Sequence, residues 1–187
     1  MRSVRRIRVI SGLLAVAAFV HGLAVFALPY LATHVVVDRI LTRTNADANE
    51  LIVAAPRDAG ADLVPMENPD TVTAAAWLDL DAGPQVLELS LPSSALYASI
   101  SVYAHHTDTE FLLSDRDLPE PQSRAPLRVL ILRRDDAVPA GEFTHVARIS
   151  TRRAFLLVRA VLQDRYEPTQ VERVVGELRQ ASLRPAR

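Results

Sequence analysis

The chain has 187 residues, no Cys and a formal net charge of −1. The absence of Cys excludes disulfides, cysteine nucleophiles and thiolate metal sites. All 21 basic residues are Arg, and they form neither an Arg-rich helix nor a basic groove with interleaved aromatic residues, so we expect no nucleic-acid partner.

The small net charge hides a strong segregation of charge along the chain. Residues 1–46 carry a net charge of +5, residues 47–120 a net charge of −12, and residues 121–187 a net charge of +6. The simplest interpretation is that the acidic and basic segments pair within one fold. The alternative is a cationic face that binds an anionic partner or lipid headgroups.

An apolar segment near the N-terminus, Val9 to Val37, has no Asp, Glu, Lys or Arg in 29 residues. As a helix it would be about 43 Å long, which exceeds the ~30 Å hydrocarbon core of a bilayer. Its length, and the lack of a small-x-small site at its end, argue against a cleaved signal peptide and against a buried core helix. We therefore predict a basic cytoplasmic tail at 1–8, an uncleaved transmembrane anchor at 9–34 and an extracytoplasmic β-rich domain at 35–187.

The basic residues around this segment predict its direction. Arg2, Arg5, Arg6 and Arg8 precede it, and positive charges favour the cytoplasmic side, so the N-terminus should lie inside and the domain outside. The lipid bilayer is then a partner. His21 is more simply a tolerated polar residue near the midplane of the membrane than part of a relay.

After the anchor, the pattern predicts a juxtamembrane helix over Val35–Ala54 and a loop over Arg57–Pro69. Short runs between turn residues predict strands over Thr71–Leu80, Gln85–Leu91, Leu96–His105, Thr109–Leu113, Leu127–Arg133, Thr144–Ile149 and Ala154–Leu162, the last of which also fits a helix. Pro168 starts a helix that we expect over Thr169–Leu183. The predicted fold class is α+β, with an N-terminal transmembrane helix and a mainly antiparallel β-sheet or sandwich flanked by a juxtamembrane and a C-terminal helix.

One block of residues carries a family resemblance. It runs through Asn68-Pro69-Asp70-Thr71, Ala76-Trp77-Leu78-Asp79-Leu80 and Gly83-Pro84. This block resembles the (N/R)-x-D-T-L-Y-S-x-A-W-x-D-L-x-x-G-P pattern of the bacterial domain of unknown function 1254 family. Softer matches are Tyr97 to Tyr103 before Thr107-Asp108, and Arg152 to Arg159 before the terminal helix. The chain departs at Val72-Thr73-Ala74, where the family tends to have Leu-Tyr-Ser.

The resemblance implies a location and an architecture rather than a reaction, because the family has no settled activity. Longer relatives carry a second β-rich domain, so a separate membrane-anchored protein is expected to supply that half. We predict a single-pass protein of the bacterial inner membrane whose outer domain is a protein-interaction module. No cofactor or catalytic residue is predicted, and the balance of features favours a protein that is not an enzyme.

The alternative function is a pocket that binds or acts on a small or saccharide-like molecule, lined by Asp70, Tyr97, Tyr103 and Arg159. Alternation in Leu96–His105 places Tyr97, Tyr103 and small hydroxyl side chains on one face of a strand. Arg159 lies within an apolar strand, so we expect it to be buried and to need a carboxylate partner, for which Asp70 or Asp79 would serve. Asp70 and Asp79 more simply cap turns.

Three further residues, His106, Asp108 and Glu110, would share one face of an extended strand, and their side chains are ones that bind metals. They stand where a strand enters a loop, so a solvated strand end is the favoured interpretation and no metal is predicted. Trp77 is interpreted as a core residue. The chain has no Gly-x-Ser-x-Gly elbow and no glycine-rich phosphate loop.

Overall fold

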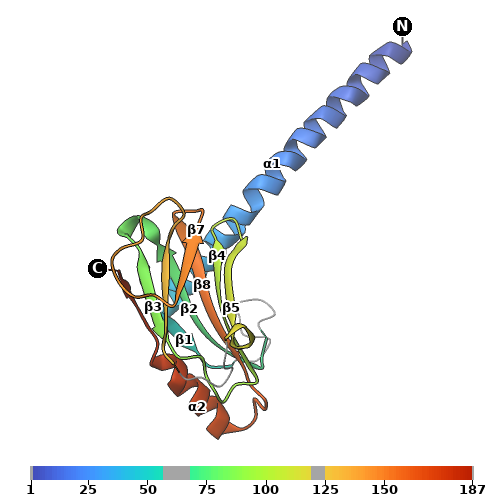
Figure 1. Cartoon of the computed structure of the whole chain (residues 1–187). Coiled ribbons are helices and arrows are strands. Elements are labelled where there is room, and N and C mark those ends of the chain that lie inside the picture. Colours follow the sequence, from blue (N-terminus) through green and yellow to red (C-terminus); the bar gives the residue numbers. More distant parts are fainter. Residues whose placement is uncertain (1, 57–67, 119–124, 187) are drawn as a thin grey trace.

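The computed structural model describes residues 2–56, 68–118 and 125–186. In these residues a long N-terminal helix, α1 (Arg2–Thr44), leaves one end of a β domain, and a short helix, α2 (Pro168–Arg179), lies at the opposite end (Figure 1). The α+β class with an N-terminal apolar helix, a mainly antiparallel β-fold and a C-terminal helix is confirmed.

The strands form two sheets. The five-stranded sheet is antiparallel throughout, with the order β1 (Ile52–Ala54), β2 (Thr71–Asp79), β8 (Arg153–Val161), β4 (Tyr97–Ala104) and β5 (Thr109–Ser114). The four-stranded sheet has the order β7 (His145–Ile149), β6 (Leu127–Arg133), β3 (Gln85–Leu89) and β9 (Ser182–Pro185), and only its β6–β7 pair is parallel. Short 3₁₀ turns follow β2 at Leu80–Ala82 and β5 at Asp115–Asp117.

The core lies between the two sheets, because each strand turns alternate side chains inward. On β8 the inward residues Ala154, Leu156, Val158 and Ala160 are fully buried. They share one apolar cluster with inward residues of the four-stranded sheet and with α2. From the four-stranded sheet and α2, the cluster includes Leu87, Val129, Ile131, Ala147, Ile149, Val174 and Leu178. Helix α2 therefore closes one end of the sandwich.

Helix α1 is the one helix in the described part of the chain that is long and apolar enough to span a membrane. Its C-terminal portion contacts the β domain instead. The Tyr30 ring meets His105 edge-on with 5.3 Å between centroids, and Val37 is only 6% exposed. The apolar helix is therefore longer than a bilayer requires because its last residues pack on the sheet.

The juxtamembrane helix ends earlier than predicted. Helix α1 continues without a break to Thr44, and Asn45 follows with a positive φ of 53°. The Ala46 N–H donates to the Leu41 carbonyl at 3.3 Å, as in a Schellman C-cap, where Asn is tolerated in the left-handed region. Beyond this cap Ile52–Ala54 pairs with β2 as a strand, so the prediction of helix to Ala54 is wrong.

The C-terminal helix is also shorter than predicted. Helix α2 ends at Arg179, and Ser182–Pro185 forms strand β9 on the edge of the four-stranded sheet, paired with β3. Strand β8 confirms the strand alternative for the segment that also fitted a helix. Positions 57–67 of the predicted loop at Arg57–Pro69 lie outside the described residues.

The segregated charges pair within the fold, as the simpler interpretation expected. Glu88 on β3 accepts a hydrogen bond from Arg128 on β6 at 2.9 Å and also pairs with Arg184 on β9. Arg134 pairs with Glu110 at 3.1 Å. Each contact joins an Arg of the basic C-terminal segment to an acid of the middle segment.

Candidate functional site

The candidate site lies on the face of the five-stranded sheet that points away from the sandwich core, here called the outer face. Strand β8 occupies the middle of the sheet, and its register with β2 and β4 arranges the outer-face side chains in rows. Four rows cross the sheet: Trp77, Phe155 and Tyr103; Ala75, Leu157 and Ser101; Thr73, Arg159 and Ser99; Thr71, Val161 and Tyr97. Hydroxyl groups therefore flank an apolar and cationic central strand.

All members of these rows except Trp77 form the floor of a groove with a cavity volume of about 660 Å³. From Phe155 to Val161 the floor is about 20 Å long at ~3.3 Å per residue. Its walls are Ile40 and Thr44 of α1, strand β1, and Leu112 of β5. Cavities of roughly 300–1,000 Å³ with mostly apolar linings and a few placed polar groups are typical of small-ligand sites.

Arg159 is the only charged side chain among the described residues that line this groove. Its guanidinium donates a hydrogen bond to the Tyr103 hydroxyl at 3.1 Å. In the described part of the chain it forms no ion pair. The expectation of a buried Arg159 with a carboxylate partner is therefore wrong, because the strand alternation points this side chain into the groove and leaves it exposed.

A second hollow, of about 400 Å³, adjoins the groove beneath α1. It shares Tyr103, Phe155, Leu157 and Arg159 with the groove, and Ala32, Thr33, Val36 and Val37 of α1 form its other wall. The groove and this hollow are thus two parts of one concave surface that passes Arg159 and ends against α1.

Three of the four residues of the alternative pocket prediction, Tyr97, Tyr103 and Arg159, line the groove together. Asp70 does not line it. Asp70 is exposed at the start of β2, where its carbonyl accepts a hydrogen bond from the Leu162 N–H at 2.8 Å. Asp79 lies nine residues further along β2, about 30 Å away, so the two carboxylates form no acid–base pair.

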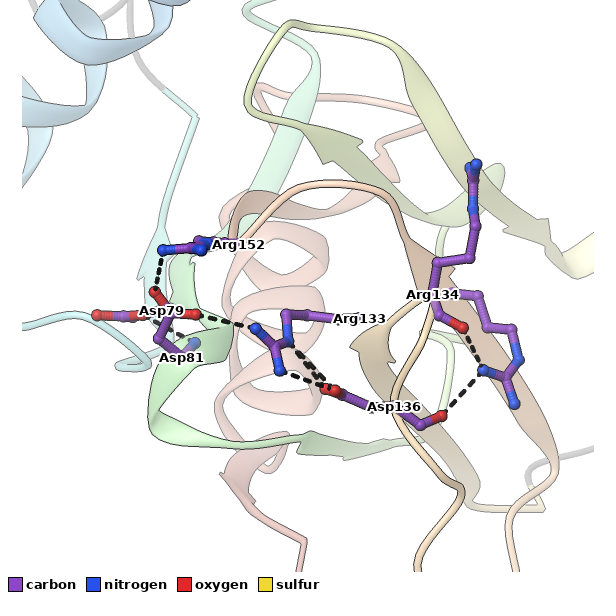
Figure 2. Close-up of polar contacts among 7 residues, drawn as sticks. Asp79, Asp81, Arg133, Arg134, Asp136 and Arg152 are labelled. Carbon is purple, nitrogen blue, oxygen red and sulfur yellow. Dashed lines mark hydrogen bonds and ion pairs between the residues drawn. The ribbon is translucent and has the colours of Figure 1, made fainter.

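Asp79 caps a turn, as its simpler interpretation holds. Its carboxylate accepts a hydrogen bond from the Asp81 N–H at 3.1 Å, at the start of the 3₁₀ turn. Figure 2 shows the polar cluster around this turn, in which Arg133 bridges Asp81 at 3.2 Å and Asp136 at 2.9 Å. This cluster ties β2, β6 and the turn after β6 together and is structural in character.

The three metal-like residues do not converge. The chain turns at Thr107, which has a φ of 77°, so the extended geometry that would align their side chains is absent. His106 lies 3.5 Å from Asp108, whereas Glu110 binds Arg134 and the Ser150 N–H. Among the described residues no group of three His, Asp or Glu side chains is placed to hold a metal ion.

His105 lies where α1 meets the sheet. Its ring contacts Tyr30 and also Trp77, the latter with 5.4 Å between centroids. Burial lowers the pKa of His105 most, and the nearby charges of Arg153, His34 and His106 lower it further. Trp77 is 7% exposed and thus buried as predicted, but it lies beneath α1 rather than in the sandwich core.

Several groove residues were missed from the sequence. The alternation in β4 indicated a hydroxyl-bearing face, so Ser99 and Ser101 could have been added to Tyr97 and Tyr103. Thr73 could be placed beside Arg159 only once the β2–β8 register was known. No sequence pattern indicates that Ile40 and Thr44 line the groove, because their position depends on how α1 packs against the sheet.

Comparison with known proteins agrees with this fold. The family model described as Protein of unknown function (DUF1254) matches residues 48–183. The chain belongs to this family. No curated protein sequence matches this DUF1254 chain.

Two solved structures resemble this DUF1254 protein. The VPA0106 protein from Vibrio parahaemolyticus superposes with a TM-score of 0.66 at 14% identity, covering 86% of this chain and 36% of its own. An uncharacterised protein from Burkholderia cenocepacia gives a TM-score of 0.44 at 18% identity, covering 81% of this chain and 46% of its own. The chain thus spans less than half the length of either, and the likeness to VPA0106 shows a shared fold.

Proposed function

We propose that this DUF1254 protein is a single-pass protein of the bacterial inner membrane, with its N-terminus in the cytoplasm and its β domain in the cell envelope. Its role in this proposal is to bind a small ligand in the outer-face groove. The N-terminal apolar helix and the Arg residues before it support the anchoring and the orientation.

One observation carries the binding role: a groove of about 660 Å³ holds Arg159, an exposed cation and the one charged side chain among its described lining residues, beside hydroxyl and apolar side chains. Such a cation, oriented by Tyr103, is a ready partner for a negatively charged or polar ligand group. Phe155 and Leu157 beside it offer apolar contact. The groove can therefore bind a molecule that has both a polar or anionic group and an apolar part.

The test is to identify small molecules that co-purify with the full-length chain when it is extracted with its surrounding lipid by a polymer. Ala75→Phe places a ring in the groove, whereas Ala137→Phe adds the same ring to an exposed turn and serves as the matched control. Mass spectrometry should find a compound enriched with the wild-type chain and with Ala137→Phe, but not with Ala75→Phe.

Equal recovery of every compound from all three proteins, with unchanged thermal unfolding, would contradict a ligand site in the groove. Lipids that merely surround the anchor are recovered equally from all three and are thereby distinguished from a groove ligand. Thermal unfolding also shows whether the added ring at Ala75 has disturbed the fold.

A second candidate function is pairing with a separately encoded second domain on another membrane-anchored protein. This candidate rests on the family to which the chain belongs, because longer relatives are expected to carry a second β-rich domain. Crosslinking of the tagged full-length protein in its native membrane should then capture one stoichiometric partner. If no stoichiometric partner is captured, the result argues against pairing and favours the ligand-binding function.

A further inference from the structure

The shape and charge of the concave surface indicate the class of ligand, on the premise that the groove is the binding site proposed above. Arg159 lies about 13 Å along β8 from Phe155, and Leu157 lies between them on the same face. A path from the cation toward α1 is therefore lined by apolar side chains. It ends at Val36 and Val37, which form the helix wall of the second hollow.

The position of α1 indicates where such a ligand would come from. The helix residues that line the second hollow, between Ala32 and Val37, overlap the C-terminal end of the membrane span predicted at 9–34. The apolar end of the concave surface therefore lies beside the anchor. Its polar end, with Arg159, Ser99 and Thr73, lies further into the domain.

Charge complementarity selects an anion. Arg159 is the sole charged side chain among the described residues that line the two hollows, so none of these residues brings a carboxylate that would repel a negative group. Its guanidinium is fixed by the Tyr103 hydroxyl, which leaves other N–H donors for a carboxylate or phosphate. A neutral ligand would leave this cation without a counter-charge.

We propose that the groove binds a single-chain anionic amphiphile taken from the bilayer. In this arrangement its carboxylate or phosphate pairs with Arg159, and its alkyl chain lies over Leu157 and Phe155 toward α1. Tight binding requires both the anionic head group and the alkyl chain. A free phosphate ion or a neutral lipid should therefore bind more weakly than the amphiphile.

The chain carries its own reporter, because Trp77 is its single Trp and pairs directly with Phe155 across the sheet. Bromine on an alkyl chain quenches indole fluorescence only at short range. The experiment adds ω-bromoundecanoate to the full-length protein in phosphatidylcholine nanodiscs and follows Trp77 emission. The methyl ester of the same acid tests the charge, and inorganic phosphate, added as a competitor, tests the head group alone.

Wild-type protein should be quenched in a saturable manner, and Arg159→Gln should weaken the apparent affinity about tenfold or more, because a charge-assisted hydrogen bond is lost. Arg173→Gln removes the same charge from α2, away from the groove, and should change nothing. The ester should quench wild type no better than it quenches Arg159→Gln. Millimolar phosphate should displace the acid only weakly.

Equal binding of acid and ester would overturn the requirement for an anion. Displacement by phosphate as complete as by unbrominated undecanoate would overturn the requirement for a chain and indicate a soluble anion as ligand. Quenching that is unsaturable and unchanged in Arg159→Gln would overturn the proposal altogether. If Ala75→Phe still lost a co-purifying compound, the groove would remain a ligand site even though its ligand is not an anionic amphiphile. Failure of the amphiphile proposal is therefore distinguishable from failure of the proposed ligand site.

Discussion

At the residue scale, binding of an anionic ligand depends on Arg159 and on the hydroxyl that orients it. Tyr103→Phe removes the acceptor of the Arg159 hydrogen bond and leaves the ring in place. We expect affinity for ω-bromoundecanoate to fall about tenfold, with little change in thermal unfolding because both side chains face the groove. Tyr166→Phe, at a position that is 79% exposed and outside the groove, is the control. Unchanged affinity in Tyr103→Phe would show that this hydrogen bond does not prepare the site.

His105 makes a pH-dependent contribution to stability. Its pKa is lowered from 6.5 in the folded protein, first by burial and then by Arg153 and its His neighbours. The unfolded state therefore binds the proton more readily, so the contribution is present above about pH 6.5 and is lost as the pH falls toward the lower pKa of the folded state. Midpoints of thermal unfolding measured between about pH 7.5 and 5.5 should fall in the wild type.

His105→Gln is the matched variant for this effect, because it keeps a polar side chain that does not titrate. Its midpoint should decline less over the same pH range. A slope identical to that of the wild type would assign the pH dependence to other groups.

Residue-level prediction succeeded where one strand carried the information. The alternation in Tyr97–Ala104 placed Tyr97 and Tyr103 on one face, and both line the groove. The sequence predicts a buried Arg159 because Val158 and Ala160 on either side are apolar; in the structure those two are buried and Arg159 is exposed. Strand alternation shows that Arg159 points to the other side of the sheet from Val158 and Ala160. It does not show that α1 covers that outer face only in part.

At the element scale, the contact between α1 and the sheet can be broken at one residue. Val37 is 6% exposed against the outer face, whereas Val35, two residues earlier, is 60% exposed. Val37→Ser should loosen this part of α1 from the sheet and admit water to Trp77, which shifts its emission to longer wavelength. Val35→Ser makes the same chemical change on the free side and should leave the emission unchanged. Identical spectra for both variants would mean that α1 is not held at Val37.

The elements that the sequence predicted best are those with long internal patterns. The apolar run of α1 and the alternation of β8 and β4 are visible without partners. Strand β1 has three residues and β9 has four, one of them Pro185, and each takes its form from the strand it pairs with. Both helices are predicted too long because apolar residues of these short strands, Ile52 in β1 and Leu183 in β9, also fit a helical spacing.

At the scale of the whole molecule, part of the segregated charge is paired within the fold. Arg residues of the C-terminal segment bind acids of the middle segment at Glu88, Asp81 and Glu110. Among the described residues that line the groove, Arg159 is the one charged side chain and forms no ion pair with another described residue, and the groove lies beside the helix that fits a membrane span. Sequence patterns predicted the anchor and the sandwich, but which face became concave depends on the register and on the placement of α1.

One introduced cysteine can test whether this groove is a ligand site outside the cytoplasm. Thr73→Cys introduces a thiol into a Cys-free chain directly opposite Arg159 in the sheet, and a nearby cation favours the reactive thiolate. Intact spheroplasts are treated with a membrane-impermeant maleimide, with and without undecanoate. Glu142→Cys, on an exposed turn, reports labelling outside the groove.

We expect both cysteines to be labelled from outside in intact spheroplasts, and undecanoate to slow labelling at position 73 several-fold but not at position 142. Labelling of either cysteine only after lysis would place the domain in the cytoplasm. Labelling at position 73 that is rapid and unaffected by undecanoate would contradict the binding site.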